Sequence, residues 1–382
     1  MVAVFVIYGL ISEETDSMAA NGENQRERMR ERPRKGGKPM SKSFVNKALL
    51  GSAVAAGAAV WAIAPRTFSD KRRNYVPSIP DVWYAHRGLH DAGSGLTPEY
   101  AAHSGEYVAL ARRCALRAGY GTADFSGSIA PENSLAAFAA ACEAGFGIEL
   151  DVQLTKDGRV VVVHDDNLLR VAGDPRKIAD LTYEELSRIP LFPAPAKPGD
   201  AEAAPVADPV AAAQFAPQGY YQHVPLFVDV LRVIAGRVPV IVEYKFADNA
   251  AWGERADELM EKGDQLLQAY DGPYVIESFH PGAVNWYKEH RPGVCRGQLA
   301  EPASLTGTGA KEWLAGLLAF DWISRPDFVA FDWHGGPSPQ LRAARWMGAI
   351  PVSWTVRSAD ELAECDQYFD RHIFESFVPD SK

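Results

Sequence analysis

From about residue 80 onward, the chain alternates short runs of β-branched and aromatic residues with longer stretches of helical periodicity. This alternation is typical of a parallel sheet whose strands are joined by crossover helices. Eight strand candidates occur, at 82–88, 147–154, 160–164, 239–245, 274–279, 295–299, 328–333 and 351–357. Eight strands close a (β/α)8 or TIM barrel, and about 300 residues is within the usual length of that fold. We therefore predict an α/β TIM barrel over residues 80–382.

Helical segments follow most of these strands. They are expected at 134–144, 249–270, 281–290, 338–347 and 359–369, and Ser358 is a suitable N-cap for the last one. Two stretches do not fit the repeat and are predicted to be insertions. Residues 89–131 have Gly-rich ends around a helical middle, and residues 191–222 are rich in Ala and Pro, which is typical of an extended surface loop. Because the loop after a barrel strand lies on the catalytic face, the first insertion is placed to act as a lid, with a merely decorative loop as the alternative.

An apolar run precedes the predicted barrel. Residues 48–64 carry no charge, and Phe44 and Val45 extend the run to a length that just crosses a bilayer. We expect a transmembrane anchor helix at 44–65. Nine Lys and Arg residues at 26–47 outnumber the four at 66–73, which predicts an extracytoplasmic position for the domain that follows. A cleaved signal peptide is disfavoured because Pro65 follows the small-residue cleavage site, and a buried Ala-rich helix is the remaining alternative.

Composition narrows the possible functions of the chain. Residues 1–43 are polar and rich in Arg and Glu, which predicts disorder, and Met18 or Met40 is an alternative start. The remainder has ample apolar residues for a core, since 47% of the 382 residues are hydrophobic. A net charge of -10 argues against a nucleic-acid-binding surface. The four cysteines form no C-x-x-C pair, so a zinc ribbon or dithiol redox motif is not indicated, and buried free thiols are expected.

Ionisable residues stand at the ends of successive strand candidates, where apolar residues are expected. They are His86 with Arg87, Glu149 and Asp151 with His164, and Glu243 with Lys245. In a barrel these strand ends converge on one mouth, and strand alternation puts Glu149 and Asp151 on the same side. Three inward carboxylates would repel one another unless a cation lay between them. Oxygen ligands without cysteine favour Mg²⁺ or Ca²⁺ over zinc.

These residues could cleave a phosphodiester. That reaction needs charge neutralisation on the nonbridging oxygens, a base for the nucleophile and an acid for the leaving alkoxide. His86 and His164 can exchange the base and acid roles near neutral pH. Arg87 can hold a phosphate oxygen with a bidentate fork, and Lys245 can add a point charge. Taken singly, a histidine on a strand is often a core residue, so the prediction depends on the whole set.

The chain resembles the glycerophosphodiester phosphodiesterase family over about residues 82–380. The matching motifs, in family order, are His86-Arg87-Gly88, Pro131-Glu132-Asn133-Ser134, Glu149-Leu150-Asp151, Asp157-Gly158, 161–165, 242–245, Ser278-Phe279 and 354–356. The resemblance implies a metal-dependent TIM-barrel enzyme that hydrolyses glycerophosphodiesters to glycerol 3-phosphate and an alcohol. The family mechanism is usually drawn with the substrate's own neighbouring hydroxyl attacking phosphorus, followed by hydrolysis of the cyclic phosphate.

The resemblance also implies roles for individual residues. The metal ligands would be Glu149, Asp151 and Glu243, the acid/base pair His86 and His164, and the phosphate contacts Arg87 and Lys245. Glu132 would lie beside the metal, either as a ligand or as a carboxylate behind the ligands. Trp354 could form an apolar wall for the glycerol moiety or be a plain core residue.

The sequence departs from the family in three places. The insertion after Gly88 is longer than usual, the closing Thr-Asp-x-Pro motif appears as 375–379, and Ser134 replaces a threonine. The first departure puts substrate choice in doubt. Three alternatives therefore stay open: a phospholipase-like enzyme acting on intact lipids, a hydrolase of teichoic-acid-type polymers, and a non-catalytic barrel that binds phosphodiesters.

Overall fold

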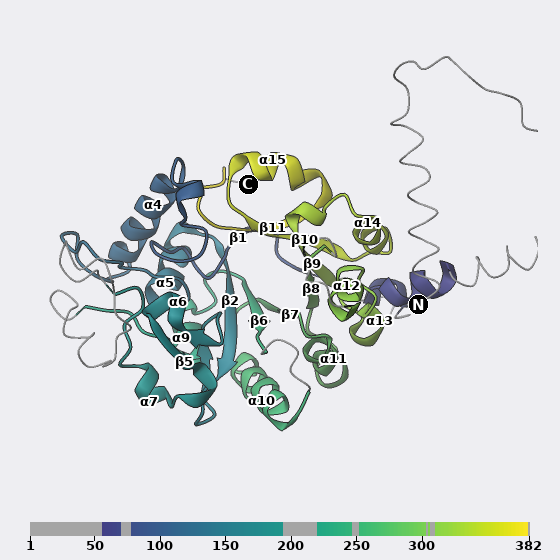
Figure 1. The fold of residues 1–382 in the computed structure, drawn as a ribbon, viewed down its shortest axis with the longest axis horizontal. Coiled ribbons are helices and arrows are strands. Elements are labelled where there is room, and N and C mark those ends of the chain that lie inside the picture. The colour runs from purple at the N-terminus through teal and green to yellow at the C-terminus, as the bar shows by residue number, and fades with distance from the viewer. Residues whose placement is uncertain are drawn as a thin grey trace, which may run out of the picture.

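The computed structural model describes residues 56–69, 78–193, 220–246, 252–302, 305 and 310–380. Its centre is a closed barrel of eight parallel strands, in the order β1-β11-β10-β9-β8-β7-β6-β2, and pairing of β1 with β2 completes the ring. The strands are β1 (Trp83–Ala85), β2 (Gly147–Leu154), β6 (Val240–Tyr244), β7 (Tyr274–Ser278), β8 (Arg296–Ala300), β9 (Phe328–Asp332), β10 (Ile350–Val356) and β11 (Arg371–Phe374). Figure 1 shows the strands as a ring, and their labels follow one another around it in this order. The predicted TIM barrel is confirmed.

One of the eight predicted strands is not a barrel strand. Residues 160–164 were expected in the barrel, but β3 (Val160–Val162) pairs antiparallel with β2. The turn that joins the two strands contains Gly158 at φ 71° and is far too short for the crossover that a parallel pair needs. The eighth barrel strand is β11, which the sequence did not reveal because its four residues begin with Arg371 and His372.

Helices cover the outside of the barrel (Figure 1). The main ones are α5 (Leu135–Ala144), α9 (Phe227–Ile234), α10 (Glu254–Gln268), α11 (Pro281–His290), α12 (Ala310–Gly316), α13 (Asp321–Ser324), α14 (Pro339–Trp346) and α15 (Ala359–Cys365), with short 3-10 turns η4 (Trp333–Gly335) and η5 (Asp366–Tyr368). The predicted N-cap is confirmed, since the Ser358 hydroxyl accepts a hydrogen bond from the backbone N–H of Glu361. Ser134 caps α5 in the same way through Ala137.

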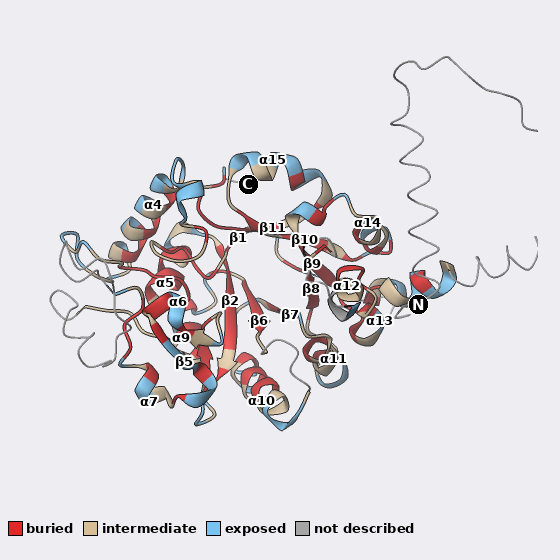
Figure 2. Ribbon diagram, in the orientation of Figure 1, coloured by how far each residue is buried: buried red, intermediate tan, exposed pale blue. Residues whose placement is uncertain are grey.

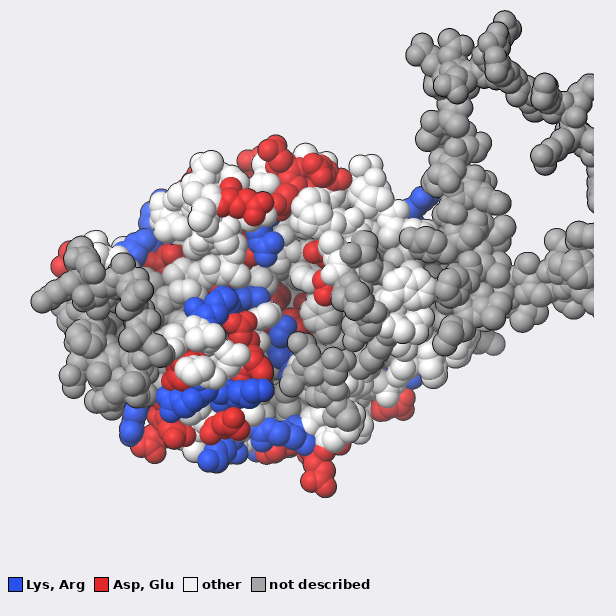
Figure 3. All heavy atoms as spheres, viewed as in Figure 1, with Lys and Arg blue, Asp and Glu red and all other residues white. Residues whose placement is uncertain are grey.

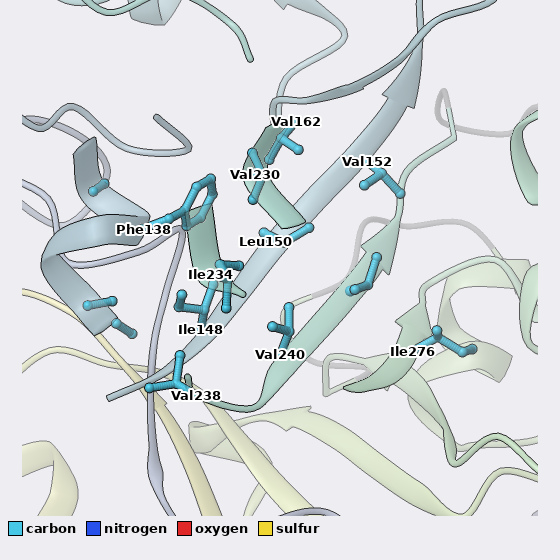
Figure 4. Packing of buried hydrophobic residues seen from close by; sticks show 14 of the residues in the cluster. Phe138, Ile148, Leu150, Val152, Val162, Val230, Ile234, Val238, Val240 and Ile276 are labelled. Atoms are coloured by element: carbon cyan, nitrogen blue, oxygen red, sulfur yellow. The ribbon is translucent and has the colours of Figure 1, made fainter. Parts of the chain in front are cut away.

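Apolar side chains fill two layers. The outer layer lies between the strands and the helices, where Phe138 of α5 and Ile234 of α9 pack against Leu150 of β2 (Figure 4). The inner layer fills the barrel itself and includes Ile241 and Val352. Figure 2 shows the strands almost entirely buried. Because both layers are apolar, the polar side chains at the carboxyl ends of the strands are confined to the mouth of the barrel.

The first insertion is an ordered part of the domain. It contains η1 (Pro98–Tyr100) and α4 (Ser104–Arg117), and α4 packs against α5 with Tyr107 and Cys114 buried. Asp91 ties the two ends of the insertion together, because its carboxylate accepts hydrogen bonds from Arg112, from Ser128 and from two backbone N–H groups. Of the second insertion, residues 194–219 lie outside the described residues.

A small subdomain leaves the barrel between β3 and β6. It consists of the two-stranded sheet β4 (Asn167–Leu168) and β5 (Asp174–Lys177), with α6 (Leu169–Ala172), η2 (Ile178–Asp180) and α7 (Tyr183–Leu186). It has its own apolar cluster, which includes Leu168, Ile178 and Leu186. This subdomain places residues 165–177 beside the mouth of the barrel, as the contacts described below show.

The prediction of a membrane-anchored, extracytoplasmic domain is corrected by the structure. In the part of the chain that the structure describes, no helix has the length and apolar character to cross a membrane. The predicted disordered segment 1–43 and residues 44–55 of the predicted anchor lie outside the described residues. Residues 56–63 are helical and pack on the barrel side, where the Arg325 guanidinium donates to the carbonyl oxygens of Trp61 and Ala64 at 2.6 and 2.9 Å.

The chain that follows is also fastened to the barrel. The Arg66 side chain, at the start of α3 (Arg66–Ser69), is buried and pairs with Asp327 at 3.4 Å. The Trp61 ring stacks on Trp322 of α13 with 5.4 Å between ring centres. The described end of the apolar run thus has a polar partner in the distant loop before β9, which the sequence pattern does not reveal.

Candidate active site

Three buried carboxylates form a cluster at the mouth of the barrel. Glu149 and Asp151 project from β2 and Glu243 from β6, and Asp151 lies opposite Glu243 in the strand register. One oxygen of each carboxylate lies within 4.8 Å of the others. The structure thus brings together the three carboxylates that the sequence suggested as metal ligands. Parallel pairing of β2 with β6 is what aligns them, because neighbouring strands end at the same edge.

Electrostatics in this cluster favour a bound cation. Burial and the neighbouring carboxylates raise the pKa of Glu149 well above its usual range. Burial likewise raises the pKa of Glu243 to about 7, although Lys245 opposes this shift. Burial would also raise the pKa of Asp151, but His164, Lys245 and Arg87 together lower it. The buried Asp151 Oδ1 has no hydrogen-bond partner. This oxygen-only set of donors fits a hard divalent cation such as Mg²⁺ or Ca²⁺.

A fourth carboxylate, Glu277, was not identified from the sequence. It lies on β7 opposite Glu243 in the register, is 1% exposed, and its Oε2 has no hydrogen-bond partner. Burial and the charges of Glu243 and Asp151 raise its pKa well above the usual range. The signal was available, because strand alternation puts Glu277 on the same face as Val275, which belongs to the cluster inside the barrel.

His86 follows β1 and is held by a carboxylate. Its Nδ1 lies 2.8 Å from Oε2 of Glu375, and its Nε2 lies 3.9 Å from Oε2 of Glu149. Burial lowers the pKa of His86 to about 4, although Glu375 opposes this shift. Glu375 is itself fixed by Arg357, whose Nε donates to Oε1 at 2.7 Å, and by the Ser94 hydroxyl. The sequence marked the closing segment 375–379 only as a departure from the family and missed this role of Glu375.

His164 is held in a similar way. Its Nδ1 lies 2.6 Å from Oδ1 of Asp165, and its Nε2 lies 3.0 Å from Nζ of Lys245. A lysine ammonium group can only donate, so Nε2 accepts, and the network therefore assigns the imidazole proton to Nδ1, which donates to Asp165. Burial lowers the pKa of His164. Lys245 also contacts Glu243 at 3.0 Å, which links this histidine to the carboxylate cluster.

Arg87 lies in the left-handed region at φ 57°, next to Gly88 at φ 81°. This turn points its backbone N–H at Oε2 of Glu149, 3.0 Å away. Glycine is needed beside it because a Cβ on Gly88 would lie 2.9 Å from the backbone of Ala137. The His-Arg-Gly motif therefore bends the chain over the carboxylates.

Glu132 lies outside the three-carboxylate cluster found among the described residues. Arg87 donates to its Oε1 at 2.8 Å, and Arg170 donates to both of its oxygens. Burial would raise the pKa of Glu132, but Arg87 and Arg170 hold it well below the usual range. The next residue reaches the cluster instead, because the Asn133 amide donates to Oδ2 of Asp151 at 2.8 Å. The sequence did not identify Arg170 or Asn133 as part of the site.

Trp354 and Phe279 border the mouth on the side of Lys245. Their rings meet edge to face with 5.5 Å between centres, and Nζ of Lys245 lies 5.7 Å from the centre of the Phe279 ring. Phe279 is 40% exposed. Figure 3 shows Lys and Arg side chains beside Asp and Glu side chains around the centre of the face that it draws.

Fold and site together define a TIM-barrel protein with a buried carboxylate cluster, flanked by two histidines and two cationic side chains. The model of the glycerophosphoryl diester phosphodiesterase family matches residues 125–370, which is more than half of the chain. The chain belongs to this family.

Similar proteins include a glycerophosphodiester phosphodiesterase of Bacillus altitudinis, 30% identical over 170 residues that make up 43% of this chain and 59% of the relative. A second, from Caldanaerobacter subterraneus, is 50% identical over 60 residues, which are 15% of this chain and 25% of the relative. The match thus spans less than two thirds of either relative. Glycerophosphodiester phosphodiesterase 1 of Rattus norvegicus is 24% identical over 282 residues, covering 66% of this chain and 74% of the relative.

Solved structures support the fold. A phosphodiesterase of Oleispira antarctica, in complex with the product sn-glycerol-3-phosphate, has a TM-score of 0.51 at 18% identity and covers 78% of this chain and 93% of its own. A putative glycerophosphoryl diester phosphodiesterase of Silicibacter pomeroyi has a TM-score of 0.51 at 18% identity and covers 79% of this chain and 92% of its own.

Proposed function

We propose that this protein is a metal-dependent glycerophosphodiester phosphodiesterase, which hydrolyses glycerophosphodiesters to glycerol 3-phosphate and an alcohol. The observation that carries the proposal is the arrangement of the two histidines around the carboxylate cluster. Each histidine has a carboxylate at Nδ1. Nε2 of His86 lies beside Glu149 of the cluster, and Nε2 of His164 lies beside Lys245. Membership of the family and the motifs that span the barrel support the same conclusion.

Glu149, Asp151 and Glu243 would hold the divalent cation. When bound, Mg²⁺ or Ca²⁺ would neutralise charge on the nonbridging phosphate oxygens as a Lewis acid. The remaining site residues act around this cluster. Asn133 orients Asp151 by donating to Oδ2, and the backbone N–H of Arg87 orients Glu149. Glu132 fits the role of a carboxylate behind the ligands, which holds the Arg87 side chain in place.

The two histidines would exchange protons with the substrate. Burial lowers the pKa of both, so each is neutral near pH 7 and able to accept a proton at Nε2. The imidazolium formed by that transfer is stabilised by the carboxylate at Nδ1, which is Glu375 for His86 and Asp165 for His164. One histidine, as the neutral imidazole, removes the proton from the attacking hydroxyl. The other takes up a solvent proton at Nε2 when the anionic phosphate binds and delivers that proton to the leaving alkoxide.

Cationic and apolar side chains would bind the rest of the substrate. Arg87 and Lys245 supply positive charge for the phosphate beside the cluster. Phe279 and Trp354 offer an apolar edge next to Lys245, which suits the carbon atoms of the glycerol moiety. The hydroxyl group of Ser94, which belongs to the first insertion, donates a hydrogen bond to Glu375. This insertion therefore takes part in building the site.

The test is release of glycerol 3-phosphate from glycerophosphocholine and glycerophosphoethanolamine by the full chain, with EDTA and with Mg²⁺ or Ca²⁺ added back. We expect release that EDTA abolishes and added metal restores. The His164→Ala protein, folded by circular dichroism, is the control for contaminating activity. No release from folded wild-type protein under any metal condition would overturn the proposal. Cleavage of intact phospholipids or glycerol-phosphate polymers in its place would assign the site to those phosphodiesters.

A further inference from the structure

Arg170 uses all three nitrogens of its guanidinium group on two carboxylates. It lies on α6 in the subdomain between β3 and β6. Its Nε donates to Oδ2 of Asp165 at 2.8 Å. Its two terminal nitrogens donate to the two oxygens of Glu132 at 2.9 and 2.6 Å. These carboxylates come from different parts of the chain, since Glu132 precedes α5 and Asp165 follows β3.

Each of these carboxylates holds a residue of the proposed site. Asp165 accepts from Nδ1 of His164 at 2.6 Å, and Glu132 accepts from Arg87 at 2.8 Å. A continuous path of hydrogen bonds therefore runs from His164 through Asp165, Arg170 and Glu132 to Arg87. Glu132 is 2% exposed, so water cannot easily replace either of its guanidinium partners.

We propose that Arg170 is a positioning residue, which fixes the orientation of His164 and Arg87 relative to each other through Asp165 and Glu132. The proposal deepens the proposed function and rests on it for its kinetic consequence. Arg170 reaches the cluster only through other side chains, so its effect on the reaction is indirect. Arg170 holds Asp165 where its carboxylate accepts the hydrogen bond from Nδ1–H of His164. Nε2 of His164 then carries no proton and accepts from Lys245.

The chemistry of the side chain explains why arginine is needed here. A guanidinium group is a flat fork with five donors and can engage two carboxylates at once. A lysine in its place would offer one ammonium group on a flexible stem, which can approach Glu132 or Asp165 but does not hold both in a fixed geometry. Arg170→Lys should therefore keep the charge and lose the alignment.

The chain provides a matched control within the same subdomain. Arg176 of β5 is 41% exposed at its side chain, against 39% for Arg170, and it also holds a carboxylate with its guanidinium fork. Its partner is Asp174, which contacts no residue of the proposed site in the described hydrogen bonds. Arg176→Met therefore removes a similar ion pair from the same subdomain without breaking the path to His164.

The experiment compares Arg170→Met, Arg170→Lys and Arg176→Met with wild type in three measurements. They are kcat and KM for glycerophosphocholine, the His164 tautomer by ¹⁵N NMR of the imidazole nitrogens, and thermal unfolding. We expect kcat of Arg170→Met to fall about 10- to 100-fold, as is usual when a supporting residue behind a catalytic group is lost. Arg170→Lys should recover only part of this loss. Both Arg170 variants should lose the single Nδ1–H tautomer of His164, and Arg176→Met should match wild type.

The NMR measurement separates this proposal from the proposed function, because it needs no turnover. If wild type releases no glycerol 3-phosphate, the function fails, and a changed His164 tautomer in the Arg170 variants still supports the positioning role. An Arg170→Met protein with wild-type kcat and an unchanged tautomer would overturn the role. If Arg170→Met does not fold, the Arg170→Lys variant tests the proposal. Wild-type kcat with a wild-type His164 tautomer would contradict the proposal, whereas a lower kcat with loss of the single Nδ1–H tautomer would support it.

Discussion

Replacing Glu149 with glutamine should raise the stability of the metal-free protein and reduce the stabilisation that metal adds. In the metal-free protein, Glu149 shares a buried site with Asp151 and Glu243, and the three oxygens lie within 4.8 Å of one another. Two unit charges at that separation repel by about 3.5 kcal/mol at an effective dielectric constant of roughly 20. Proton uptake relieves part of this repulsion, because the pKa of Glu149 is raised. The glutamine keeps an oxygen that can accept the Arg87 N–H.

The sign of the pH effect follows from the raised pKa. Between the ordinary glutamate pKa of about 4.3 and the raised value, the folded protein binds a proton that the unfolded chain has released. The stability of metal-free wild type therefore falls as pH rises through this window. Glu149→Gln removes that dependence, so the variant should be more stable than wild type near pH 8, by up to roughly 3 kcal/mol.

Added metal should narrow this difference, because it stabilises wild type more than the variant. A cation at about 100 times its dissociation constant stabilises the fold by about 2.7 kcal/mol. Loss of one of three carboxylate ligands should weaken binding at least about tenfold, which removes about 1.4 kcal/mol or more of that stabilisation. The assay is urea unfolding in EDTA and in a Mg²⁺ or Ca²⁺ series for wild type, Glu149→Gln and the control Asp264→Asn. Asp264 is a buried carboxylate of α10 that pairs with Arg291 and accepts a hydrogen bond from Gln268, and neither partner belongs to the carboxylate cluster.

The control should lose stability equally with and without metal. If metal stabilises Glu149→Gln as much as wild type, or if the variant is less stable than wild type in EDTA, the assignment of Glu149 to a cation site is wrong.

Three further outcomes are expected. His164→Ala should abolish glycerol 3-phosphate release while leaving the circular dichroism spectrum unchanged, and near-normal turnover would exclude His164 as an acid/base group. Burial lowers the pKa of His86 to about 4, so below about pH 6.5 the unfolded chain gains a proton that the folded protein excludes. The free energy of unfolding therefore falls by up to roughly 3 kcal/mol as pH falls from about 6.5 toward 4. Urea unfolding of His86→Asn should show a smaller loss of stability over this pH range. Phe138→Ala should reduce the free energy of unfolding by about 3–5 kcal/mol, since this fully buried ring fills the layer between α5 and β2 (Figure 4), and a loss below about 1 kcal/mol would contradict that packing.

The sequence predicted the carboxylate cluster from one local rule and from the expected parallel barrel. Strand alternation puts Glu149 and Asp151 on one face, and parallel strands end at the same edge, which brings Glu243 beside them. Helix starts were equally local, as the caps at Ser134 and Ser358 show. Strand alternation and helix caps depend on neighbours a few residues away, so they can be inferred without knowing the fold. The position of Glu243 follows only once a parallel barrel is assumed.

The groups that hold the two proposed catalytic histidines depend on tertiary structure. Glu375 meets His86 across 289 residues of sequence, and Arg170 meets Glu132 across 38. The described end of the predicted membrane segment shows the same dependence, because Arg325 donates to the Trp61 carbonyl from 264 residues away. Local patterns in the sequence were enough to predict the barrel, its mouth and the residue types at the mouth. Only the folded chain decided which strand closes the barrel and which side chains orient each histidine, since such pairs form when strands distant in sequence become neighbours in the ring.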